Sequence, residues 1–217
     1  MPVSAVLFRH ATSAYERIPA TPTPRAPAQH EALTSIVFAA AALEAFINEL
    51  ADFSNESVYS EPLDPIYIAF AGLIEELEKS RASTASKFWL GKWVLTAKPY
   101  DKGAQPYQDF VLLLDLRNTL VHARFLDRLE QDPNEPGGYT RSVGPPAIIS
   151  KLESKGILAE SPISAMSWGG QITTKATARW ACDTASAIVI SFLEGLPKCR
   201  HSDFVRRFYS QSFAPTA

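Results

Sequence analysis

The sequence has little that could hold the protein together by disulfide or metal bonds. Only Cys182 and Cys199 are cysteines among its 217 residues. Two cysteines are too few for a disulfide framework, and no His or Cys pair near them has the spacing of a metal site. We therefore expect neither a metal nor another cofactor. The chain is long enough to bury a substantial core without such supports, and its 46% of hydrophobic residues exclude a mainly disordered protein.

Long apolar runs and a leader pattern are also missing. The longest apolar run, from Ile36 to Leu43, stops at Glu44 and is too short to span a bilayer. Arg9 and Glu16 interrupt the apolar residues near the N-terminus, and no basic segment precedes them as in a signal peptide. The sequence therefore predicts a cytoplasmic protein with no membrane partner.

Basic residues are missing from one long stretch of the chain, although the net charge is only −2. From Glu31 to Glu78 there are ten acidic residues and no Lys or Arg. Two basic clusters follow: Lys79, Arg81, Lys87, Lys92, Lys98 and Lys102, and later Lys198, Arg200, Arg206 and Arg207. These charges form either solvated helix faces that neutralise one another or a surface that faces phosphate groups.

Apolar residues at three- and four-residue steps predict an all-α protein of one domain, residues 1–217. In the longest helix, residues 29–55, Ile36, Leu43 and Leu50 fall on the face that we expect to be core. A proline-rich connector, residues 18–28, precedes it, and a loop-rich insertion covers residues 130–172. The other predicted helices are 3–17, 65–79 with Asp64 as its cap, 83–97, 107–129, 147–155 and 173–196, and the insertion is expected to hold a hairpin around Gly137 and Gly138 and a strand at 163–168.

The predicted helix 107–129 is apolar nearly all round, so its polar residues are informative. Asp115, Asn118 and His122 lie three and then four residues apart, which places them on one narrow stripe. Arg117, five residues before His122, lies on a different side of the predicted helix. The two side chains can share a pocket through long reach, through local bending, or through a second copy of the helix, and this geometry suggests a composite site.

The residue types in this helix suit metal-free cleavage of RNA. An arginine offers a permanent cation and a fork of donors for a phosphate, and a histidine takes up or releases a proton near neutral pH. We expect Arg117 to stabilise the charged transition state and His122 to act as acid or base. Asn118 would hold the phosphate or orient the imidazole, and Asp115 would fix the tautomer of His122.

The sequence LRNTLVHARF, which carries Arg117 and His122, resembles the signature of HEPN domains. In this family an Arg, a polar residue and a later His stand on a late helix of the bundle. The segment AAALEAFINEL is similar to the early core helix of many HEPN proteins. The resemblance covers about residues 29–129, with the helix 173–196 as a further member.

The resemblance implies an up-and-down helical bundle, here with additional helices and an irregular insertion, that forms a homodimer through the motif helices. It implies a metal-independent endoribonuclease that cleaves single-stranded RNA, as a toxin with an antitoxin partner or as a defence effector. Arg117, Asn118 and His122 would be the catalytic residues, and Glu44 and Asn48 of the early helix would support them. The alternative is a HEPN module that binds nucleotides, RNA or protein without catalysis.

A purely structural interpretation of the same residues stays open. Arg117 can be paired with Asp115 or Glu44, and His122 can be a buried residue bonded to a neighbouring helix. Glu44 and Asn48 can serve only to fix the register of two helices. The other histidines, His10, His30 and His201, have no arrangement of a ligand set and are interpreted as surface or loop residues, and the four tryptophans are interpreted as core.

Overall fold

The computed structural model describes residues 2–19, 28–55, 64–122, 129–131, 139–141, 147–158 and 168–214. Over these residues the protein is all-α apart from one small ribbon, as predicted. The helices are α1 (Val3–Arg17), α2 (Ala28–Asn55), α3 (Pro65–Lys79), α4 (Thr84–Thr96), α5 (Tyr107–Val121), α6 (Ala147–Ser154), α7 (Trp168–Ile172), α8 (Lys175–Glu194) and α9 (Arg200–Ser212). The ribbon pairs strands β1 (Leu129–Gln131) and β2 (Tyr139–Arg141).

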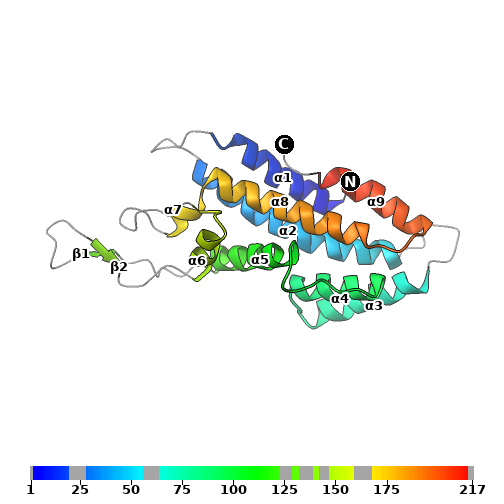
Figure 1. Cartoon of the computed structure of the whole chain (residues 1–217). Helices are drawn as coiled ribbons and strands as arrows, with labels where there is room; N and C mark the ends of the chain where they lie inside the picture. Colours follow the sequence, from blue (N-terminus) through cyan, green and yellow to red (C-terminus); the bar gives the residue numbers. More distant parts are fainter. Residues whose placement is uncertain are drawn as a thin grey trace.

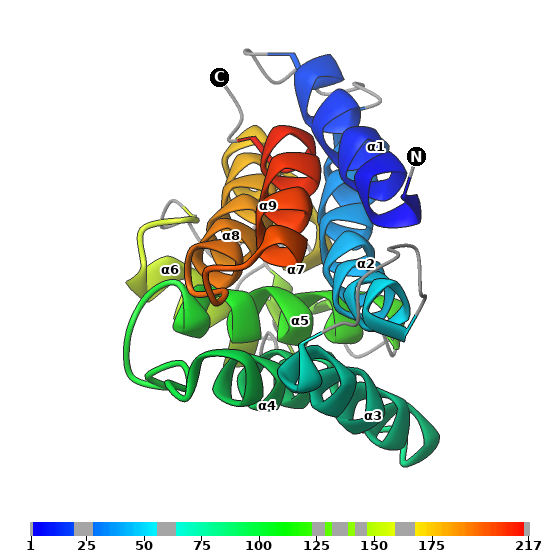
Figure 2. The same cartoon turned by 90° about the vertical axis from the view of Figure 1, so that its right-hand side faces the viewer.

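The helices form two groups that meet at α2. In both views α1, α2, α8 and α9 lie together, and α3, α4 and α5 lie below them (Figures 1 and 2). Helix α2 contacts α1 and α8 in the first group and α3, α4 and α5 in the second. The ribbon of β1 and β2 projects at one end of the molecule, beyond α6 and α7 (Figure 1).

The predicted core face of α2 is confirmed. Ile36, Leu43 and Leu50, which periodicity assigns to it, are 0% exposed, and so are Ala39, Phe46 and Ile47 on the same helix. Burying a large aliphatic or aromatic side chain contributes about 1.5–3 kcal/mol relative to leaving it in water. By length and composition alone, residues 30–54 of α2 could cross a membrane. Core helices share this property, and here the apolar face of α2 packs against the other helices.

Local capping explains where several helices begin and end. The Asp64 carboxylate accepts a hydrogen bond from the backbone N–H of Ile66 at 3.1 Å, as predicted for the start of α3. Ser83 caps α4 in the same way, and Thr174 caps α8. Gly156 follows α6 with a φ of +69°, a conformation that favours glycine.

Glycine is also required where α4 approaches α3. A Cβ atom added at Gly91 would lie 2.7 Å from the Phe70 ring. The ring itself is fully buried, so it has no room to move away. This close approach positions the rest of α4 against α2.

Three sequence predictions were wrong in their details. The helix predicted to run to Leu129 ends at Val121, and Leu129 lies in β1. Trp168, placed at the end of a strand, begins α7, while residues 163–167 lie outside the described ranges. After Pro197 the sequence predicts only one or two helical turns, but the structure contains α9, of 13 residues, in which Tyr209 packs against Phe46 of the core. The antiparallel pairing of Glu130 with Thr140 confirms two paired strands in the region of the predicted hairpin, whose expected turn at Gly137 and Gly138 lies outside the described ranges.

Candidate functional site

Helix α5 carries the candidate residues on a buried scaffold. Phe110, Leu113 and Leu116 are 0% exposed, and the helix contacts α2, α8, α4 and α6. The helix ends at Val121, so His122 is its C-cap residue, with φ −104° and ψ 24°. The predicted motif therefore occupies the last turn of α5 and its cap, where the backbone leaves the helix.

The predicted polar stripe lies on the surface. Asp115, Asn118 and His122 are all exposed. His122 is thus not the buried, bonded histidine of the structural interpretation. Within the described part of the chain its imidazole has no hydrogen bond or ion pair, so the predicted contact with Asp115 is not formed there. The backbone carbonyl of Asp115 instead accepts a hydrogen bond from the Thr119 hydroxyl at 2.8 Å.

Arg117 is joined to two of the other predicted residues. Its Nη2 donates to Glu44 Oε2 at 2.7 Å, and its Nη1 donates to Asn118 Oδ1 at 3.0 Å. The Arg117 side chain is 25% exposed and that of Glu44 is 42% exposed. An ion pair this open to water contributes about 0.2–1 kcal/mol, so its main effect is to orient the guanidinium on the surface of α5.

The predicted supporting residue Asn48 lies one turn after Glu44 on α2 but has a different partner. Its Oδ1 accepts a hydrogen bond from Lys87 Nζ at 3.1 Å. Lys87 also forms an ion pair with Glu78, and its side chain is 2% exposed. Burial lowers the pKa of the Lys87 ammonium, and the negative charge of Glu44 opposes that shift.

Lys87 was missed as a functional candidate, although the sequence holds a signal for it. Lys87, Gly91 and Leu95 follow one another at four-residue steps, and all three are buried. A lysine on the buried stripe of a helix needs polar partners nearby. The order of residues cannot say which helix supplies them, because the contact depends on how α4 crosses α2.

Together these residues form a polar strip across the four helices α2 to α5, which we call the polar seam: Glu78, Lys87, Asn48, Glu44, Arg117 and Asn118. Glu44 stands between two cations, bonded to Arg117 and acting electrostatically on Lys87. The seam holds Arg117 at the surface and leaves its Nε without a partner in the described ranges. A phosphate arriving at this surface would find an oriented cation.

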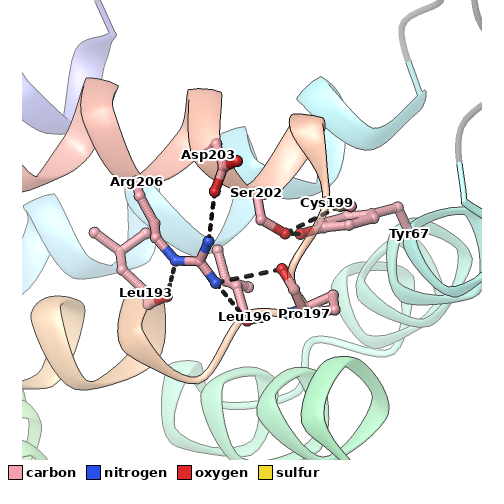
Figure 3. A network of polar contacts seen from close by, with 8 residues as sticks. All are labelled: Tyr67, Leu193, Leu196, Pro197, Cys199, Ser202, Asp203 and Arg206. Atoms are coloured by element: carbon pink, nitrogen blue, oxygen red, sulfur yellow. Dashed lines mark hydrogen bonds and ion pairs between the residues drawn. The ribbon is translucent and has the colours of Figure 1, made fainter.

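The second basic cluster predicted from the sequence is partly structural. Arg206 of α9 turns back to the end of α8, where its guanidinium donates to the carbonyls of Leu193, Leu196 and Pro197 and to Asp203 (Figure 3). This use of Arg206 satisfies carbonyls that have no partner within α8. Its charge is therefore not free to face a phosphate.

His201 corrects the prediction that it is a surface residue. It is 7% exposed, and its ring lies 4.4 Å from the Tyr67 ring, edge to face. Tyr67 and Ser202 are joined by a hydrogen bond in the same place (Figure 3). Burial lowers the pKa of the His201 imidazole. We refer to Tyr67, His201, Ser202 and Arg206 with its partners as the α8–α9 corner.

In the described ranges, no group of three His, Cys, Asp or Glu side chains could hold a metal ion. The tryptophans, all predicted to be core, differ in burial, because Trp168 is buried but Trp93 is 49% exposed.

Comparison of the chain with family models, with curated proteins and with solved structures finds no match. The candidate site therefore rests on its residues and their geometry.

Proposed function

We propose that the protein is a HEPN-like, metal-independent endoribonuclease that cleaves single-stranded RNA in the cytoplasm. The observation that carries the proposal is the presentation of Arg117 and His122. Glu44 and Asn118 orient the Arg117 guanidinium, and His122 is exposed at the end of the same helix. A cation and an imidazole are thus both accessible to solvent at the C-terminal end of α5.

The proposed reaction uses two proton transfers and a cation, and needs no metal ion. A base removes the proton of a ribose 2′-hydroxyl, and the 2′-oxygen attacks the adjacent phosphorus. The new bond closes a 2′,3′-cyclic phosphate, and the bond from phosphorus to the 5′-oxygen breaks as an acid returns a proton to that oxygen. His122 supplies base or acid, and Arg117 stabilises the negative charge on the phosphoryl oxygens.

A second copy of the chain would complete this site. One His122 cannot serve both proton transfers at once when the two oxygens lie on opposite sides of the phosphorus. Val121, beside His122, is 56% exposed, although most large apolar residues of α5 are buried. We propose that the ends of two α5 helices pack together through this surface and place two His122 side chains across one cleft. An antitoxin would act by covering it.

The test compares RNA cleavage by the wild type and by matched variants in EDTA. We expect fragments with cyclic-phosphate ends from the wild type and a loss of about 10²–10⁴-fold for His122→Ala and for Arg117→Ala. The controls are His30→Ala, an exposed histidine on α2, and Arg179→Ala, an exposed arginine paired with Asp183 on α8. Full activity in the two site variants would exclude this mechanism.

A non-catalytic binding module is the second candidate, and one observation favours it. The Arg117 guanidinium is bonded to the Glu44 carboxylate, so a phosphate must compete with that carboxylate. A binding module would retain RNA and release it uncut at every protein concentration. Gel-shift assays with intact recovered RNA would then replace cleavage as the readout.

A further inference from the structure

A pocket of about 590 Å³ lies beside α5, and its lining residues are different from those of the polar seam. Tyr107, Val111 and Leu112 of α5 supply its apolar lining, and Lys151 of α6 and Lys155, the residue after α6, also line it. Lys102, from the loop before α5, also lines it. Helix α6 packs beside α5 at this place.

The three lysines differ in what they already contact. Lys155 is paired with Asp109 at 2.6 Å, and the Lys102 ammonium lies 4.7 Å from the centre of the Trp89 ring. Lys151 is exposed and has no ion pair in the part of the chain that the structure describes. Exposed lysines beside an apolar wall suit a ligand with a phosphate group and a flat apolar body.

Asp115 connects this pocket with the motif. It lines the pocket, and it belongs to the exposed stripe that ends at His122, seven residues further along the chain. At the rise of an α-helix this separation is about 10 Å along the axis. A single RNA strand that lies along α5 could therefore place one nucleotide in the pocket and a neighbouring phosphodiester at Arg117 and His122.

We infer that the pocket is a nucleotide subsite that holds single-stranded RNA while a neighbouring linkage is cut. The base lies against Tyr107 and Val111, and Lys102 and Lys151 hold the phosphates. This assignment rests on the proposed ribonuclease function for its purpose, but binding is measured without cleavage. The pocket, rather than the charge of the whole chain, is what selects the RNA.

The experiment measures fluorescence anisotropy of a labelled single-stranded RNA oligonucleotide on the full-length His122→Ala protein. Adding Lys102→Glu and Lys151→Glu together is expected to weaken binding at least tenfold, and to lower the slope of log affinity against log salt by about 2. Lys198→Glu is the matched control, because Lys198 is exposed in the connection between α8 and α9. We expect less than a twofold change for it.

A second variant separates the pocket from its charge. Val111→Trp places a large side chain in the pocket without changing any charge. Circular dichroism and thermal melting show whether this variant stays folded. Loss of RNA binding by this folded variant supports the subsite. Unchanged binding in both the lysine and Val111 variants overturns it, even if the wild type cleaves RNA.

Competition experiments distinguish other occupants of the pocket. Nucleoside monophosphate that binds through Lys151 while RNA does not bind would overturn the RNA assignment. Polyglutamate that competes as well as RNA of equal charge would also overturn it, because the lysines would then act as a general cationic surface. A protein that never cleaves RNA but binds it through these residues would disprove the proposed function and retain the subsite.

Discussion

Arg117 in the polar seam and Arg206 in the α8–α9 corner use the same side chain in opposite ways. At Arg206, Nε, Nη1 and Nη2 all have acceptors, and most of these are backbone carbonyls near the end of α8. At Arg117, Nη1 and Nη2 are engaged by side chains, and Nε has no acceptor in the described ranges. The two side chains are almost equally exposed, at 28% and 25%.

The difference teaches that exposure alone does not identify a functional cation. A guanidinium bonded to backbone carbonyls cannot leave them without breaking a helix connection. A guanidinium held by a half-exposed carboxylate can exchange that partner for a phosphate at little cost. The predictions below test this contrast between the corner and the seam.

The largest effect is expected from removing the two arginines in turn. Arg206→Ala leaves the carbonyls of Leu196 and Pro197 without their side-chain donor and should lower the free energy of unfolding by about 2–4 kcal/mol. Arg117→Ala should lower it by less than about 1 kcal/mol. Urea denaturation of both variants measures the contrast, and equal losses would contradict the division into structural and available cations.

A smaller effect is expected at the buried cation of the seam. Lys87→Met removes a desolvated charge and keeps a similar volume, while Glu78, 57% exposed, stays in contact with water. We expect Lys87→Met either to leave the free energy of unfolding unchanged or to raise it by up to about 2 kcal/mol. Thermal melting compares it with Lys198→Met, an exposed control, and marked destabilisation by Lys87→Met alone would make the Lys87 ion pair a required part of the fold.

The corner should also respond to pH through His201. Its pKa is lowered in the folded protein, so the unfolded chain binds the proton more readily as pH falls below the usual histidine value. Stability from this group is present above about pH 6.5, the usual histidine pKa, and is lost as the pH falls from there through the lowered pKa of the folded protein. His201→Phe should flatten this decline in urea denaturation, and His30→Phe should not. An unchanged slope in His201→Phe would disprove the assignment.

The smallest effect is expected for Glu44→Gln. The amide can still accept a hydrogen bond from Arg117, but the charge attraction is lost, so stability should fall by about 0.5 kcal/mol. If Glu44 only positions Arg117, RNA cleavage remains detectable in this variant. Complete loss of cleavage with normal stability would place Glu44 among the catalytic residues, and the quantity measured is the initial rate of release of labelled fragments.

Much of the helical structure could be predicted from local patterns. The bounds of α1 and α3 agree with the prediction at both ends, because prolines and an Asp cap mark them in the sequence. The end of α5 was missed because the apolar pattern continues past Val121 with no proline or glycine. The length of α9 was not predicted, because its few large apolar residues stabilise the helix through contacts with α2, which is far away in the sequence.

The candidate site divides in the same way. The sequence by itself determined that Arg117, Asn118 and His122 lie within six residues of one another on one predicted helix and that Glu44 and Asn48 share a face of another, because helical periodicity is local. Only the tertiary structure decided that Glu44 bonds Arg117 while Asn48 bonds Lys87, and that Arg206 closes a helix end. Those partners lie 73, 39 and 13 residues apart in the chain, and their contact depends on how the helices pack.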